Sequence, residues 1–220
     1  MFQSFDATTS PDQGPPRLDA LRAVMRDTGI DCFLVPRADA HQGEYVAPCD
    51  ERLAWLTGFT GSAGFAAITQ NVAGVFVDGR YRIQVRDQVA KVFTPVDWPE
   101  TKLGPWMSDV LADGATVGFD PWLHTANELR ELRKVLDSKS IEIKPIANLV
   151  DAIWDDRPPR PAEPVFAVDK AVSGVGDQTK RNQIAKKLSE AGQRAVVITL
   201  PDSICWLLNI RGGDIPRNPI

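Results

Sequence analysis

An internal repeat constrains the fold of this chain more than any other feature of its sequence. In each copy a helix-like stretch turns at a glycine, enters an apolar strand and reaches a tryptophan-containing segment that ends in glycines. The matching segments are 18–27, Gly29, 32–36 and 54–62 in the first copy, and 184–190, Gly192, 195–199 and 205–213 in the second. Further strand and helix signals follow only the first copy. The repeat therefore predicts one complete domain and the start of a second, related one, and we expect the chain to be the front of a longer protein.

The composition indicates an ordinary globular protein with a real core, because 43% of the 220 residues are hydrophobic and 25% are charged. A formal charge of −4 and the lack of clustered Lys and Arg argue against a nucleic-acid partner. No apolar run approaches the ~20 residues that a membrane span needs. The three cysteines form no CxxC pair, which favours a reducing, cytoplasmic location.

Alternating strand and helix signals predict an α/β domain, with a mixed sheet flanked by helices on both faces. A hairpin with a turn at Gln70 and Asn71 opens this alternation. We expect helices at 17–28, 81–89, 102–111, 125–136 and 149–154, and strands at 30–36, 65–69, 73–77, 92–96, 116–119 and 141–143.

A proline-rich stretch divides the chain. Four prolines fall within residues 155–164, which cannot continue a helix and should form an extended linker. The expected organisation is a disordered lead-in at 1–16, which lacks the features of a signal peptide, a first domain at 17–156, a linker at 157–164 and the start of a second domain at 165–220.

The sequence offers little for metal binding or nucleophilic catalysis. Its two histidines, His41 and His124, have no cluster of Asp or Glu at ligand spacing around them, so we expect no metal site in these residues. The loop 58–64 is neither a nucleophile elbow nor a dinucleotide fingerprint, because its glycines are spaced three apart and precede a strand. Its glycines are best interpreted as allowing a tight turn and close packing, although the loop could also line a pocket.

Two polar segments remain as candidate binding elements. Asp78 and Gly79 should form a turn that starts a helix with Arg80 in its first turn. The Arg80 guanidinium could clamp a carboxylate or carbonyl group, or be an ordinary surface arginine. The insert 39–45, which contains His41 and Tyr45, could be a polar surface loop or could reach another domain or subunit.

Five blocks of sequence, in this order, resemble the N-terminal part of the long, three-domain Xaa-Pro aminopeptidases of the creatinase and prolidase superfamily. The blocks are Asp-Ala-His-Gln-Gly-Glu-Tyr-Val-Ala-Pro-Cys-Asp at 39–50, the glycine loop at 58–64, Val-Asp-Gly-Arg-Tyr at 77–81, Ile-Trp-Asp-Asp-Arg-Pro at 153–158 and Trp-Leu-Leu-Asn-Ile-Arg-Gly at 206–212. The resemblance extends from about residue 17 to residue 220.

The resemblance implies two related N-terminal domains of ribonuclease-H-like α/β fold, here a creatinase N-terminal domain followed by the start of a second. It also implies a separate catalytic domain that binds two Mn(II) ions and cleaves before a proline at the second position of a peptide. Arg80 matches a substrate-binding arginine of the family, and His41 and Tyr45 are weaker candidates for lining the entrance. A homodimer is implied, and the 220 residues alone should be inactive.

Two other functions stay open. The same fold could serve as a binding or scaffold module without metal ligands, or as the front of a creatinase or prolidase-type hydrolase. Two Asp, one His and two Glu further along the gene would favour an enzyme, and turnover of dipeptides against longer peptides would separate the enzymes.

Overall fold

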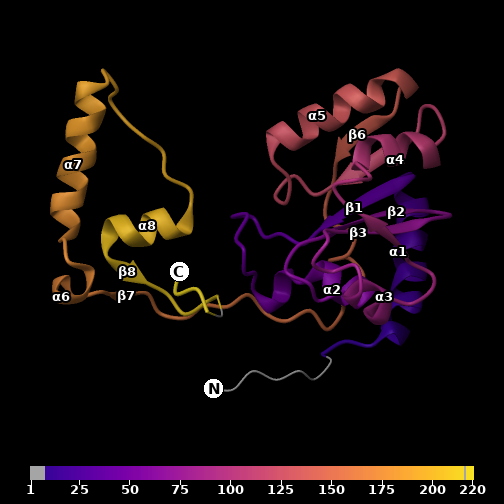
Figure 1. The fold of residues 1–220 in the computed structure, drawn as a ribbon, viewed down its shortest axis with the longest axis horizontal. Helices are drawn as coiled ribbons and strands as arrows, with labels where there is room; N and C mark the ends of the chain where they lie inside the picture. Colours follow the sequence, from indigo (N-terminus) through magenta and orange to yellow (C-terminus); the bar gives the residue numbers. More distant parts are fainter. Residues whose placement is uncertain (1–7, 216) are drawn as a thin grey trace. The chain divides into compact units, whose positions relative to one another are not determined.

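The computed structural model describes residues 8–215 and 217–220, which fall into two compact units (Figure 1). The first unit comprises the chain up to Ala40 together with Cys49–Pro158. The second comprises His41–Pro48 together with Pro159–Ile220. The polar segment His41–Pro48 therefore groups with the C-terminal part of the chain, and the chain passes between the units three times, at 40/41, 48/49 and 158/159.

A six-stranded mixed sheet forms the centre of the first unit, in the order β4-β3-β2-β1-β5-β6. The strands are β1 Cys32–Pro36, β2 Phe65–Thr69, β3 Ala73–Val77, β4 Thr94–Asp97, β5 Thr116–Phe119 and β6 Glu142–Pro145. Strand β2 runs antiparallel to β1 and β3, and all other neighbours are parallel. The predicted mixed α/β fold is thus confirmed. Five strands end at the edge of the sheet where β2 begins.

Helices cover both faces of this sheet (Figure 1). Helices α1 Gly14–Thr28, α2 Arg52–Thr57 and α3 Gln84–Gln88 contribute to one core cluster. Helices α4 Leu103–Val110 and α5 Ala126–Leu136 contribute to the other. Both clusters contain residues of β1, because successive side chains of this central strand point to opposite faces.

Helix α1 ends as its sequence predicts. Leu18, Leu21 and Met25 recur at helical spacing and are buried against the sheet. Gly29 then takes a left-handed conformation with φ of 67°, its N–H donates to the Arg26 carbonyl, and the N–H of Ile30 donates to the Met25 carbonyl. This arrangement satisfies carbonyl groups at the helix end and directs the chain into β1.

Three predicted helices of the first unit are wrong in whole or in part. Helix α1 begins at Gly14 and not at residue 17, and a short 3₁₀ helix, Pro11–Gln13, capped by the Ser10 side chain, leads into it. Residues 149–154 form consecutive turns, because the Asn148 side chain accepts the Val150 N–H and the Ile153 N–H reaches back only three residues, to the Val150 carbonyl. Helix α3 begins at Gln84 and not at residue 81. The Asp78 carboxylate accepts the N–H of Arg80 and holds the preceding residues in a turn, so Arg80 precedes the helix.

The second unit contains three helices in its described residues, α6 Lys170–Ser173, α7 Asp177–Glu190 and α8 Pro201–Leu208. Two short strands, β7 Phe166–Ala167 and β8 Ile210–Arg211, pair antiparallel. The strand expected at 195–199 is not formed, which corrects the prediction. In the described part of the chain no backbone segment pairs with it, and Val196 and Val197 are more than half exposed. Across the residues described in both units, no helix combines the length and apolar character of a membrane span.

Candidate functional site

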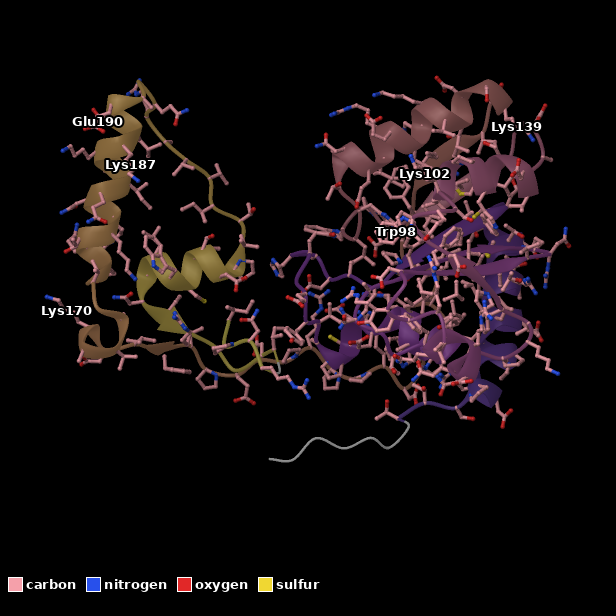
Figure 2. All side chains as sticks on the ribbon, viewed as in Figure 1. Trp98, Lys102, Lys139, Lys170, Lys187 and Glu190 are labelled. Atoms are coloured by element: carbon pink, nitrogen blue, oxygen red, sulfur yellow. The ribbon has the colours of Figure 1, made fainter. Side chains whose placement is uncertain are left out.

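The edge of the sheet where β1 and β3 end and β2 begins gathers one of the candidate binding segments, Asp78–Arg80, and the glycine loop. Arg37 follows β1, the glycine loop 58–64 leads into β2, and Asp78 and Arg80 follow β3. Trp98, labelled in Figure 2, follows β4 at the same edge and places its ring against Phe65 at 6.3 Å between centroids. Loop segments at strand ends are a usual place for binding residues, because the sheet positions them rigidly.

Arg80 is held by the carboxylate of Asp78 through a two-point contact. The Arg80 Nε donates to Asp78 Oδ1 at 3.1 Å and Nη2 donates to Oδ2 at 2.7 Å, while the Arg80 main-chain N–H also donates to Oδ1 at 2.9 Å. These hydrogen bonds from Arg80 lower the pKa of Asp78. The Arg80 side chain remains 64% exposed, and its guanidinium lies 4.9 Å from the centroid of the Tyr81 ring. The guanidinium is thus both oriented and accessible to solvent.

Tyr81 joins this corner to the glycine loop. Its hydroxyl group lies 2.6 Å from Ser62 Oγ, and its ring meets the ring of Phe59 edge to face at 5.6 Å. Arg37 Nη1 donates to the Ser62 carbonyl at 3.1 Å. The loop and the Arg80 corner therefore form one connected surface.

Close packing explains the glycines of the loop, as the sequence predicts. A Cβ added at Gly58 would lie 2.6 Å from the Gln88 carbonyl oxygen, and one at Gly64 would lie 2.9 Å from the Phe76 carbonyl oxygen. A Cβ at Gly61 would overlap the Phe59 ring. The loop is also pinned by side-chain hydrogen bonds, since the Thr60 N–H donates to Gln88 Oε1 at 2.9 Å.

The two weaker candidates belong to the other unit. His41 and Tyr45 lie in His41–Pro48, where His41 is exposed and Tyr45 is 37% exposed. Arg80 belongs to the first unit. The assignment of all three residues to substrate binding remains a prediction.

A charge cluster that the sequence reasoning missed lies elsewhere in the first unit. We call it the Arg52–Arg157 cluster; its members are Asp50, Arg52, Asp151 and Arg157. Arg52 is only 4% exposed, and its Nε donates to Asp151 at 2.6 Å while Nη1 donates to Asp50 at 2.9 Å. Arg157 reaches the same two carboxylates, with Nη1 2.7 Å from Asp151 and Nη2 3.4 Å from Asp50.

Electrostatics within the Arg52–Arg157 cluster favour the charged form of Arg52. Burial acts to lower the pKa of Arg52, but the hydrogen bonds and charges of Asp151 and Asp50 outweigh it and raise the pKa overall. The sequence held one signal of this cluster, since two of its members lie within the family-like blocks at 39–50 and 153–158. Nothing local in the sequence indicates that these blocks meet.

The described residues do not fit a metal pair. Among residues 8–215 and 217–220, no three His, Cys, Asp or Glu residues are grouped in a way that could hold an ion. His124 is packed edge-on against Phe119, and its Nε2 is buried without a hydrogen-bond partner. The nearby carboxylates make other contacts, because Glu128 accepts from Thr125 at the start of α5 and Asp120 accepts from Asn148 and Trp122.

Comparison with family models accounts for nearly the whole chain. A model described as the creatinase/prolidase N-terminal domain matches residues 17–153, and a second model with the same description matches residues 156–220. The point between the two matches lies close to the passage between the two units at 158/159.

Individual proteins also match nearly the whole chain. The chain is 39% identical over 214 residues to a probable Xaa-Pro aminopeptidase P of Pyrenophora teres f. teres, covering 93% of this chain and 32% of that protein. It is 36% identical to aminopeptidase P2 of Arabidopsis thaliana, covering 93% and 30%. The crystal structure of an X-prolyl aminopeptidase from Caenorhabditis elegans, described as a cytosolic enzyme with a di-nuclear active site, matches with a TM-score of 0.86 and 33% identity, covering 93% of this chain and 36% of that one. The chain thus spans about a third of the length of its relatives.

Proposed function

We propose a function for this chain from one premise: it belongs to the creatinase/prolidase N-terminal domain family. In our proposal, the full-length protein removes the N-terminal residue from peptides that have proline at the second position. These 220 residues are its non-catalytic N-terminal part. The observation that carries the proposal is the similarity over 93% of the chain to Xaa-Pro aminopeptidases about three times as long.

The role we assign to these residues is to shape access to a catalytic site and to contribute dimer contacts. Arg80 is the residue we propose for substrate binding. Its exposed guanidinium is oriented by Asp78 and lies at an edge where several loops meet. A guanidinium so held can donate hydrogen bonds to a peptide carbonyl or carboxylate group. We assign weaker roles in substrate binding to His41 and Tyr45 of the second unit.

The metal chemistry belongs elsewhere in the full-length protein. A pair of Mn(II) ions would supply a nucleophilic water or hydroxide and polarise the scissile amide. The described residues offer no grouped ligands for such a pair, so we place it in the remaining two-thirds of the enzyme. We also propose that the full-length protein is a cytoplasmic homodimer.

Two assays test this function. The full-length protein, supplied with Mn(II), should release the first residue from peptides that begin Gly-Pro or Arg-Pro and leave matched Gly-Ala peptides uncut. The 220 residues alone, under the same conditions, should cut neither. Cleavage of the proline peptides by the 220 residues would overturn the non-catalytic role. A full-length protein that binds no metal and cuts neither kind of peptide would favour a scaffold, and dipeptide-only turnover would favour a prolidase-type enzyme.

A further inference from the structure

The Arg52–Arg157 cluster lies beside two of the places where the chain passes between the units. One passage is at 48/49 and another at 158/159. Asp50 is the second residue after the first of these, and Arg157 is the second residue before the other. We call residues 49–50 the root of the segment His41–Pro48, and residues 157–158 the root of the proline-rich linker. Both roots therefore contribute to one side-chain cluster within the first unit.

The Arg157 guanidinium contacts residues at both roots. Arg157 Nε donates to the main-chain carbonyl of Cys49 at 2.8 Å, and its Nη2 lies 3.4 Å from Asp50. Its Nη1 lies 2.7 Å from Asp151, a few residues before it in the chain. Because a guanidinium is planar and rigid, contacts made by all three of its nitrogens fix their partners relative to one another.

The surroundings of Arg157 are fixed as well. Arg52 is buried and contacts both Asp50 and Asp151, so each of these carboxylates is held by a second arginine besides Arg157. The Arg157 guanidinium lies 6.0 Å from the centroid of the Trp154 ring, and that ring stacks on Trp55 at 5.1 Å. The linker root is thus held by packing and by charge together.

We propose that Arg157 is a positioning residue that fastens the root of His41–Pro48 to the root of the linker, so that the two segments open and close together. The coupling concerns only residues of the first unit and their covalent continuations. It does not require peptidase activity. Its relevance to substrate entry, through His41 and Tyr45, rests on the proposed function.

Reciprocity separates this coupling from general stabilisation. If the roots are coupled, loosening either one must also loosen the other, whereas the remainder of the sheet keeps its stability. If the cluster only stabilises the first unit, a change at either root must loosen the whole unit. The two cases predict different patterns of local opening.

The experiment substitutes a residue at one root and measures local opening at the other root, in two variants of this chain. Arg157→Met keeps an apolar side chain but removes the guanidinium, and it should speed cleavage after Glu44 by a Glu-specific protease by about tenfold. Asp50→Asn should speed hydrogen exchange of the Ile153 and Arg157 amides by a similar factor, about tenfold. Exchange of the β1 and β5 amides, which reports the sheet, should change less than about twofold in both variants.

Matched variants complete the test. Arg82→Met removes another arginine that contacts two carboxylates, Asp97 and Glu100, and should leave cleavage after Glu44 unchanged. Arg157→Lys keeps one charged donor, so its rate of cleavage after Glu44 should lie between those of the unchanged chain and Arg157→Met. Equal acceleration across the whole sheet, or unchanged cleavage after Glu44 in Arg157→Met, would overturn the proposal. If Arg157→Met does not fold, Asp50→Asn and Arg157→Lys still test the coupling from both roots.

Discussion

Replacing Gly58 with alanine tests the packing role of the glycine loop most sharply. Gly58 has φ of 86°, and an added Cβ would lie 2.6 Å from the Gln88 carbonyl oxygen, a main-chain atom that cannot swing aside. The left-handed conformation costs a non-glycine residue about 1–2 kcal/mol. Forced displacement of the neighbouring backbone adds a cost of about 1–3 kcal/mol. We expect a loss of about 3 kcal/mol, which lowers the Tm of a unit of roughly 150 residues by about 6–12 °C.

Two other glycines separate the contributions. Gly29 has φ of 67° but no atom within 4 Å of an added Cβ, so Gly29→Ala should show the conformational cost alone, about 1 kcal/mol. Gly79 has neither a left-handed φ nor a neighbour within 4 Å. Gly79→Ala should therefore be neutral or slightly stabilising, because alanine restricts the unfolded chain.

Thermal unfolding followed by tryptophan fluorescence measures the three variants. Five of the six tryptophans belong to the first unit, so the signal reports mainly on that unit. The expected order of Tm is Gly79→Ala above Gly29→Ala above Gly58→Ala. The reasoning fails if Gly58→Ala is no less stable than Gly29→Ala, because the Gln88 contact would then have no effect.

Three further predictions concern individual side chains. For the peptidase activity that we propose for the full-length protein, Arg80→Ala should lower kcat/KM with Xaa-Pro peptides by about 10- to 100-fold, the loss of one charged hydrogen-bonding contact. Replacing the exposed Lys134 with alanine should leave kcat/KM unchanged. An unchanged kcat/KM in Arg80→Ala would contradict the role of Arg80. Burial, with a smaller contribution from Asp31, raises the pKa of Cys32 to about 12, so iodoacetamide at about pH 8 should leave this thiol unmodified until the chain is unfolded, as peptide mass mapping would show. Burial also lowers the pKa of His124, although Glu128 and Asp120 oppose it, so the unfolded chain binds this proton more tightly and stability falls as the pH drops below about 6.5. His124→Gln should flatten this dependence in urea unfolding, and an unchanged slope would show that other groups cause it.

Local signals in the sequence predicted most elements of the first unit. The bounds of β2, β3 and β5 match the structure, because each is a short apolar run between turn residues. Helix α1 and its glycine cap were also predictable, since periodicity and cap lie within one segment. The Asp78 turn competes with helix formation through a side-chain hydrogen bond, and the expected start of α3 was therefore too early.

Non-local contacts explain what the sequence could not predict. The apolar run 195–199 has the composition of a buried strand, but a strand also needs neighbours whose position no local pattern specifies. Likewise, Arg52 and Asp151 are 99 residues apart in sequence, and only the fold brings them into contact. The sequence identified Arg80 as a candidate, but the two-point contact that orients it appears only in the structure.

The outer strands of the sheet limit how two copies of the protein can associate. Strand β4 contains Pro95 and β6 ends in Pro145, and neither residue has an N–H to offer to an added strand. Glu142 and Lys144 of β6 also expose charged side chains along that margin. Extending the sheet from one subunit into another is therefore unfavourable on both sides. The homodimer that we propose for the full-length protein should therefore be sought in contacts between helices or loops, not in a sheet shared by two subunits.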